Sequence, residues 1–348
     1  MKSGGNAAFS FESEVVIRGE IPSISSFFGI SFSMRKALFP LFLFSLLFLL
    51  LLDPSRYFLS VKGGLLLFLS SVLPSMLPYF FFTKLLTATG CVSALSASFG
   101  RPVGKVYGVA PIASYPLLMS LLSGYPVGAC VLSDLYEKGL LSREDALRAA
   151  SFTSTSGSMF VLGSVGAVIL RDGRAAVVIL AAHYLGALLN GLLYRGRKRR
   201  GRAVVLPPLS RSSDSLLSEA MYESVLSLAL VGGFIALGNL LGDMAADLLS
   251  RIGLKGFFAS GSVLGGLVYS FFEVTRGCVE FASLGIGRVM TAALACGAVS
   301  FGGISVLLQS MAFLGKTGLK QRKFLLMKST QAVISFVLCL GLGAIFLS

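Results

Sequence analysis

Long apolar runs alternate with short polar segments along most of this chain. A membrane-spanning helix needs about 20 mainly apolar residues. By that measure the pattern predicts about seven membrane-spanning helices, at 37–52, 63–86, 149–170, 175–194, 216–246, 289–314 and 329–347. Two further apolar regions, 106–135 and 257–286, are interrupted by proline, glycine or charged residues. We therefore expect an all-α polytopic membrane protein.

The first interrupted region contains the stretch SGYPVG, at 123–128. Because glycine and proline weaken a helix interior, this stretch is either a turn at the membrane surface or a break inside the bilayer. The cations favour the break. If both interrupted regions are re-entrant hairpins, 20 Lys and Arg face the cytoplasm, including the seven in the loop 195–211, and only seven face outward. Cytoplasmic loops of membrane proteins carry such an excess of cations.

The two hairpins then enter from opposite faces, which predicts an inverted repeat of the kind common among secondary transporters. The expected parts are, in chain order, a mobile or mis-started extension (1–33), a first transmembrane anchor (34–60), a first half with hairpin 106–135 and an additional span (61–194), a basic cytoplasmic loop (195–213), and a second half with hairpin 257–286 and the final span (214–348).

Composition supports a membrane protein and argues against most soluble functions. Hydrophobic residues make up 55% of the 348 and charged residues 13%, against about 25% charged residues in soluble domains. The stretch 195–202 is basic enough to bind nucleic acid or anionic lipid, but a cytoplasmic loop is favoured, so no nucleic-acid partner is expected. The scattered cysteines and the one histidine, His183, suggest no metal, no other cofactor, no catalytic residues and no enzyme. His183 is favoured as a packing or hydrogen-bonding residue over a proton relay.

The first candidate binding residues lie at the tip of the first hairpin. A tip at membrane depth leaves free N–H groups at a helix N-terminus, which attract anions. Glycine lets the backbone approach a ligand closely, and proline starts the returning helix without losing a needed donor. The candidates are Ser123, Gly124, Tyr125, Pro126 and Gly128.

A second group of candidates lies in a stretch rich in hydroxyl groups, at 151–158, with six hydroxyls in eight residues. We predict an unwound segment that lines a ligand. The alternative is close helix packing by small residues, with hydroxyls bonded back to backbone carbonyls. The corresponding stretch of the second half is 298–305. The candidates are Thr153, Ser154, Thr155, Ser156, Gly157, Ser300, Gly302 and Gly303.

The third group lies at the second hairpin, where Glu273, Thr275, Arg276 and Gly277 stand between apolar runs. Charges at membrane depth cost about 2.5–3.5 kcal/mol each on insertion scales, so they usually face a cavity or a partner. Glu273 and Arg276 either neutralise each other, or Arg276 meets an anionic substrate while Glu273 binds a coupling cation or a proton. A surface turn with solvated charges is the remaining alternative.

Three of these stretches together resemble a known family. They are LLSGYPVGACVLSDLYEKGLLSREDA, SFTSTSGSMFVLGSVG and FFEVTRG, and they are similar to the YlbJ-like sporulation integral membrane proteins of endospore-forming bacteria. The resemblance covers roughly 63–347. That family carries a Gate, or nucleoside-recognition, domain distantly similar to concentrative nucleoside transporters. The resemblance implies transport of dipicolinate during sporulation, in the outer forespore membrane, which derives from the mother cell.

The resulting hypothesis is a sporulation-associated secondary transporter of a small anionic metabolite, embedded in the lipid bilayer of a bacterial cell membrane. The sequence leaves two alternatives open. One is transport of a nucleoside or another small metabolite. The other is a non-transporting membrane scaffold for spore-envelope assembly, in which the basic loop 195–211 recruits partners. The coupling ion and a homo-oligomeric state are also left open.

The topology can be tested with single cysteines introduced at Gly139 and Arg251 in a variant without the native cysteines. The hairpin layout places Gly139 on the cytoplasmic side and Arg251 on the outer side. A membrane-impermeant thiol reagent should therefore label only the Arg251 variant when added outside. Labelling of both positions from the same side would rule out the inverted arrangement.

Overall fold

The computed structural model describes residues 32–196, 213–254 and 261–348, and every regular element in this part of the chain is a helix. The predicted extension 1–33 and basic loop 195–213 lie almost entirely outside the described residues. The helices up to the basic loop are α2 (Phe32–Leu52), α3 (Pro54–Leu67), η2 (Phe68–Val72), α4 (Leu73–Ala88), α5 (Cys91–Tyr107), η3 (Pro111–Ala113), α6 (Ser114–Ser123), α7 (Val127–Glu137), α8 (Arg143–Ala149), η4 (Phe160–Leu170) and α9 (Gly173–Leu193).

The helices after the basic loop repeat part of this order. They are α10 (Ser213–Leu249), η5 (Ser250–Leu254), α11 (Val263–Phe272), α12 (Val274–Ser283), α13 (Arg288–Phe301), α14 (Gly303–Leu314), η6 (Gly315–Thr317) and α15 (Gln321–Phe346). In each half a long helix precedes a pair of short helices, and an interrupted helix and a further long helix follow. That the two halves have opposite topology remains a prediction.

Five described helices are long and apolar enough to cross a membrane, and a sixth span is obtained if the bent pair α5 and η3–α6 counts as one. The predicted span 149–170 is not continuous, because residues 154–157 have no helical structure and η4 has only 11 residues. The last helix begins at Gln321, earlier than expected, because the cations ahead of the apolar run are accommodated within the helix.

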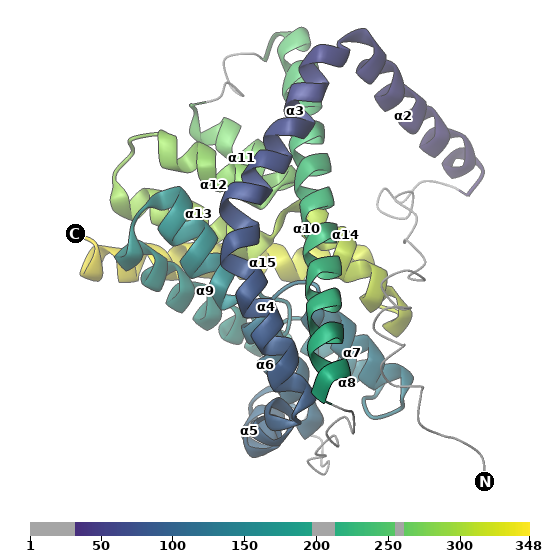
Figure 1. Cartoon of the computed structure of the whole chain (residues 1–348), viewed down its shortest axis with the longest axis vertical. Coiled ribbons are helices and arrows are strands. Elements are labelled where there is room, and N and C mark those ends of the chain that lie inside the picture. The colour runs from purple at the N-terminus through teal and green to yellow at the C-terminus, as the bar shows by residue number, and fades with distance from the viewer. Residues whose placement is uncertain (1–31, 197–212, 255–260) are drawn as a thin grey trace.

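One long helix, α3–η2–α4, lies alongside α10 (Figure 1). Small residues allow this contact: a Cβ on Gly64 would lie 2.8 Å from the Cα of Ala236. The Asn239 side chain also donates a hydrogen bond to the carbonyl of Ser60, at 2.6 Å. Close approach of backbones and interhelical hydrogen bonds drive helix association in lipid. We call α3–η2–α4 together with α10 the long pair.

Both interrupted regions form helical hairpins. The arms α6, α7, α11 and α12 have only 10 or 11 residues each, or about 15 Å of helix at 1.5 Å per residue. That is half of the roughly 30 Å hydrocarbon thickness. Both hairpins thus have the arm length expected of re-entrant segments. The first hairpin turns at Gly124, whose φ of +77° is readily available only to glycine.

The two halves interlock. The arm α7 of the first hairpin packs against α14 of the second half, and the arm α12 of the second hairpin packs against η4 of the first half. The helices α9, α13 and α15 pack together behind them. Arg288 at the start of α13 pairs with Asp172 at the start of α9, and this hydrogen bonding lowers the pKa of Asp172 to about 2. We call the hairpins with η4, α9, α13, α14 and α15 the hairpin bundle.

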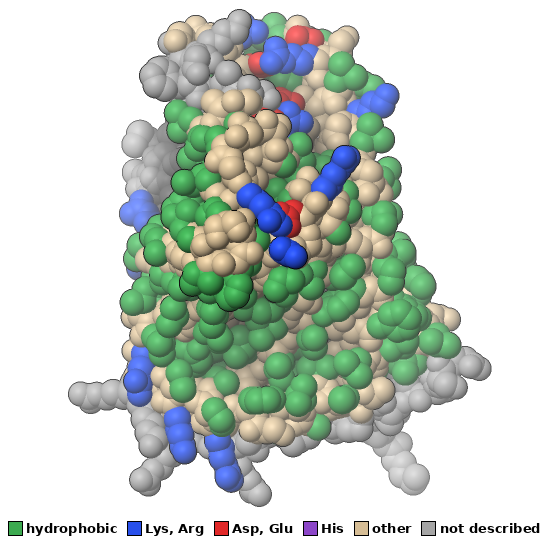
Figure 2. Space-filling view, turned by 90° about the vertical axis from the view of Figure 1, so that its left-hand side faces the viewer, with side chains coloured by type: hydrophobic (Ala, Val, Ile, Leu, Met, Phe, Trp, Pro, Cys, Tyr) green, Lys and Arg blue, Asp and Glu red, His purple; other side chains and the backbone are tan. Residues whose placement is uncertain are grey.

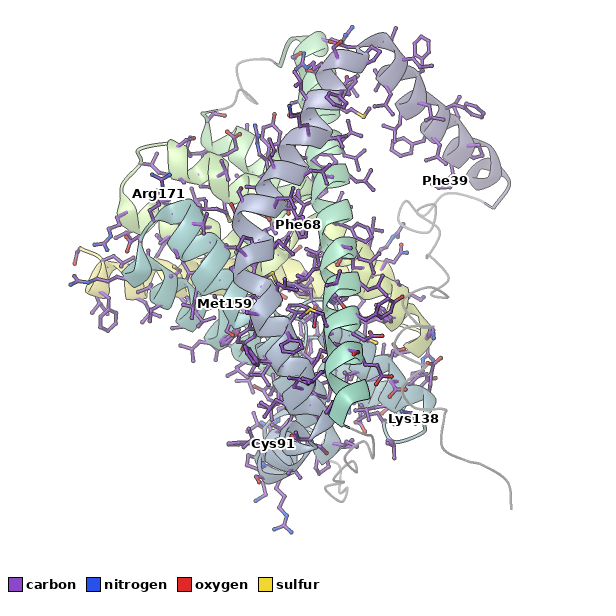
Figure 3. All side chains as sticks on the ribbon, in the orientation of Figure 1. Phe39, Phe68, Cys91, Lys138, Met159 and Arg171 are labelled. Atoms are coloured by element: carbon purple, nitrogen blue, oxygen red, sulfur yellow. The ribbon has the colours of Figure 1, made fainter. Side chains whose placement is uncertain are left out.

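The outer surface suits a bilayer. Hydrophobic side chains cover most of the face seen in Figure 2, with Lys and Arg in small groups. The helix α2 projects away from the other helices, and Phe39 lies near its far end (Figure 3). In Figure 1, α10 ends at the top of the molecule, whereas α7 and α8 lie at the bottom. The turn that follows α7, beside Lys138 (Figure 3), and the C-terminal end of α10 therefore lie toward opposite ends.

Candidate functional site

A partly open cavity lies between the hairpin bundle and the long pair, and its empty space of about 530 Å³ includes the part that is open to the surroundings. The hairpin tips contribute Ser123, Tyr125, Glu273, Val274 and Thr275, the unwound segment and η4 contribute Ser156, Gly157 and Phe160, and α14 contributes Ser305, Val306 and Gln309. The long pair contributes Met76, Val231, Phe234 and Ile235. The long pair thus contributes apolar side chains alone, whereas the other side carries all the polar groups together with Phe160, Val274 and Val306.

The tip of the first hairpin packs directly on the unwound segment 153–157. A Cβ on Gly124 would lie 2.2 Å from the backbone nitrogen of Gly157, and one on Gly128 would lie 2.3 Å from the carbonyl oxygen of Thr153. Ser120 adds a hydrogen bond, because its hydroxyl accepts from the backbone N–H of Thr155 at 3.0 Å. The close backbone approach expected at these glycines is therefore made to another protein segment.

His183, fully buried on α9, joins the interruptions of the two halves. Its Nε2 accepts a hydrogen bond from the backbone N–H of Ser156 at 2.9 Å, and its Nδ1 lies 2.7 Å from the hydroxyl of Ser300. Because a backbone N–H can only donate, Nε2 carries no proton and a neutral ring must be protonated at Nδ1. His183 is thus the hydrogen-bonding residue that the sequence favoured.

Lys328, on α15, reaches the same region and is only 1% exposed. Its ammonium donates to the hydroxyl of Tyr125 at 2.6 Å, to the carbonyl of Ser154 at 2.8 Å and to Oε1 of Gln331 at 2.8 Å. Because the last predicted span is 329–347, Lys328 just before it is one of the 20 cations that the hairpin layout assigns to the cytoplasm. The structure corrects this, because the side chain lies inside the hairpin bundle.

At the second hairpin, Glu273 acts as the N-cap of α12. Its carboxylate, 2% exposed, accepts from the backbone N–H of Arg276 at 2.7 Å and from the hydroxyl of Thr275 at 2.9 Å. The guanidinium of Arg276 instead pairs with Glu280 at 2.9 Å and lies over the ring of Tyr269. Arg276 does not line the cavity, and its guanidinium pairs with Glu280 rather than with Glu273.

The remaining glycines of the second half also serve close packing. A Cβ on Gly277 would lie 2.2 Å from the Cβ of Ser270 on the other arm of the hairpin, and one on Gly303 would lie 3.0 Å from the carbonyl oxygen of Ser270. Gly302 and Gly303, both with positive φ, separate α13 from α14. The second hairpin therefore packs against the interruption of its own half, as the first hairpin does.

Six of the predicted site residues line the cavity: Ser123, Tyr125, Ser156, Gly157, Glu273 and Thr275. Six others hold its walls together: Gly124, Gly128, Thr153, Ser154, Thr155 and Ser300. Pro126 is the N-cap of α7. The structure thus brings both hairpin tips and the unwound segment to one place, and adds Lys328, Gln331 and His183. Of these, only His183 carried a signal in the sequence, as the single histidine in an apolar run.

The packing of the first hairpin tip can be tested at Gly128. In Gly128→Val the side chain would overlap the Thr153 carbonyl and the side chain of Ser120, and overpacking of this kind costs about 1–3 kcal/mol. We expect a lower melting temperature of the purified protein. Gly341→Val is the matched control, because a Cβ on this helical glycine meets no atom within 4 Å. An equal effect of both substitutions would contradict the close contact.

Comparisons with known proteins agree with the membrane architecture. No family model matches the chain, and no solved structure matches it. The sporulation integral membrane protein YlbJ of Bacillus subtilis (strain 168) is 29% identical over 316 residues, which cover 82% of this chain and 77% of that protein. This likeness supports placing the chain with the YlbJ-like sporulation integral membrane proteins.

Proposed function

We propose that this protein is a secondary transporter that moves a small anionic metabolite, dipicolinate, across a membrane during sporulation. One observation carries the proposal: the cavity is bounded on one side by both hairpin tips and on the other by the long pair. Non-helical backbone at membrane depth is tolerated where it is buried in protein or lines a cavity. Transporters use such interrupted helices to bind substrates near the bilayer midplane.

The mechanism follows from the two bodies that enclose the cavity. The hairpin bundle holds the polar groups, whereas the long pair offers mainly apolar side chains such as Met76, Val231 and Phe234. An apolar wall makes no directional bonds with the cargo, so the cargo can stay attached to the hairpin bundle while that bundle moves. The movement must break hydrogen bonds that join the two bodies, namely Ser75–Ser164, Tyr79–Ser158 and Tyr269–Asp243. An elevator-like movement of this kind would expose the cavity alternately to the two sides.

The lining suits a small aromatic acid. Phe160, Met76 and Phe234 offer apolar contact to a flat ring, and the hydroxyls of Ser123 and Ser156 offer hydrogen-bond donors to carboxylates. The ammonium of Lys328 lies directly behind Tyr125, and places a positive charge near the polar side. Dipicolinate combines a flat ring with two carboxylates, and the sporulation family supports this cargo.

A nucleoside is the second candidate, and Glu273 favours it. The cavity holds a buried carboxylate, which repels an anion but accepts hydrogen bonds from sugar hydroxyls. Dipicolinate is preferred because the helix N-terminus that Glu273 caps offsets the negative charge of Glu273.

The scaffold alternative depends on the loop 195–211. Replacing that loop with a neutral linker of equal length would leave transport intact if the protein is a transporter, and would abolish recruitment of partners if it is a scaffold.

The membrane that fits this cargo is the outer forespore membrane, which dipicolinate made in the mother cell must cross. We propose that the protein acts there without a cofactor. It is embedded in the lipid bilayer, and the mechanism is compatible with a homo-oligomer.

Transport should be measured as uptake of radiolabelled dipicolinate into liposomes that contain the purified protein. Val231→Phe fills the cavity from the side of the long pair, and overpacking by about 1–3 kcal/mol should reduce uptake about fivefold or more. Val225→Phe is the control, since Val225 lies on the same helix and is 50% exposed. Absence of uptake by the wild type, or equal uptake by both variants, would contradict the proposal.

The charge of Glu273 separates the two cargoes. Glu273→Gln keeps an oxygen that can cap α12 but removes the negative charge. For an anionic cargo, uptake should be maintained or increase. If the cargo is a nucleoside whose hydroxyls donate hydrogen bonds to the carboxylate, nucleoside uptake should fall about tenfold. This factor corresponds to the loss of a hydrogen bond to a charged group. Competition by unlabelled nucleosides in the same liposomes gives an independent measurement.

A further inference from the structure

Lys328 is the most unusual charged group in the hairpin bundle. Its three N–H donors are all used, and the three acceptors are a phenol hydroxyl from the first hairpin tip, a backbone carbonyl from the unwound segment and a side-chain amide oxygen from its own helix. All three acceptors are uncharged. Among the residues that the structure describes, no ion pair joins Lys328 to a carboxylate.

A buried ammonium without a counter-ion is expensive, because its hydration is lost and no Coulomb attraction replaces it. The nearest titratable partners offer no negative charge. Tyr125 accepts through its hydroxyl, and His183 is held with Nε2 unprotonated by the N–H of Ser156. A lysine that served only to fill space would be replaceable by a methionine at lower cost. Three oxygens lie 2.6–2.8 Å from this one nitrogen, an arrangement that also suits a small cation.

The position of the ammonium suggests a function for this arrangement. In transporters with interrupted helices, the carbonyls of unwound backbone coordinate the coupling cation next to the substrate. Here the carbonyl of Ser154, in the unwound segment, faces the ammonium, and Tyr125 both binds the ammonium and lines the cavity. The Ser154 hydroxyl is buried without a hydrogen-bond partner, so a further oxygen is present on the same residue.

We propose that the ammonium of Lys328 is a tethered cation that occupies a monovalent-cation site formed by Tyr125, Ser154 and Gln331. A site that is permanently filled in this way needs no sodium ion to complete the polar wall of the cavity. Through its contacts with Tyr125 and Ser154, Lys328 would hold the first hairpin tip and the unwound segment together throughout the transport cycle. We therefore expect that the rate of transport by this protein does not depend on the sodium concentration. This consequence rests on the proposed transport function, whereas the cation site does not.

The test is to empty the site and offer it a free cation. In Lys328→Ala the oxygens remain and the ammonium is lost, whereas in Lys328→Met the side chain still fills the site but carries no charge. Lys323→Ala, on an exposed lysine of the same helix, is the control. The melting temperature of each purified protein is measured in N-methylglucamine, sodium, potassium and ammonium chloride at equal ionic strength.

For the wild type, Lys323→Ala and Lys328→Met, we expect the melting temperature of each protein to be the same in all four salts. Lys328→Ala should melt lower in N-methylglucamine and recover in at least one of the small cations. A cation at about ten times its dissociation constant raises the ratio of folded to unfolded protein about elevenfold, and we expect a recovery of about 2 °C or more.

Two results would overturn the inference. One is a wild-type protein whose melting temperature or dipicolinate uptake depends on sodium. The other is a Lys328→Ala variant that no small cation stabilises, including one that is unfolded in every salt. The melting measurements use no cargo, so they separate this inference from the proposed function. If the salts act as expected but dipicolinate is not taken up, only the cargo is wrong. Uptake that requires sodium would preserve the function and reject the tethered cation.

Discussion

The unwound segment 153–157 is the constraint on which the rest of the structure depends. Backbone N–H and C=O groups that leave a helix inside a bilayer must find partners within the protein, because each unsatisfied group costs several kcal/mol. The partners come from three separate elements: Ser120 of the first hairpin, His183 and Asn190 of α9, of which Asn190 binds the neighbouring Ser151 carbonyl, and Lys328 of α15. Polar side chains on otherwise apolar helices are explained by this requirement.

The same constraint fixes the position of the first hairpin. Gly124 and Gly128 bring its tip into contact with the backbone of the unwound segment, where a larger residue would overlap Gly157 or Thr153. The tip then presents Ser123 and Tyr125 to the cavity. The second hairpin reaches the cavity from the other half, with Glu273 capping α12 at the tip. Structural and binding groups are therefore close neighbours throughout the site.

Much of this arrangement could be predicted from the sequence. Proline and glycine within the run 106–135 indicated the first hairpin, and the charged stretch 273–277 within the run 257–286 indicated the second. The density of hydroxyls at 151–158 indicated the unwound segment, because such residues compete with helical hydrogen bonds. The roles of Lys328 and Arg276 could not be predicted. A lysine at the edge of an apolar run is normally interfacial, and only the fold shows that α15 begins earlier and carries Lys328 inward. Arg276 has Glu273 three residues before it and Glu280 four residues after it, and the sequence does not distinguish the two partners.

The central claim is that the hairpin bundle moves as one body against the long pair. It is tested most directly by pulsed electron–electron distance measurements between spin labels at Met221 on α10 and Val333 on α15, both exposed. A control pair at Val177 on α9 and Val333 lies within the hairpin bundle. The account predicts two distance populations for the first pair, whose proportions change when dipicolinate is added, and one unchanged distance for the control pair. A single distance between Met221 and Val333 that dipicolinate does not alter would contradict it.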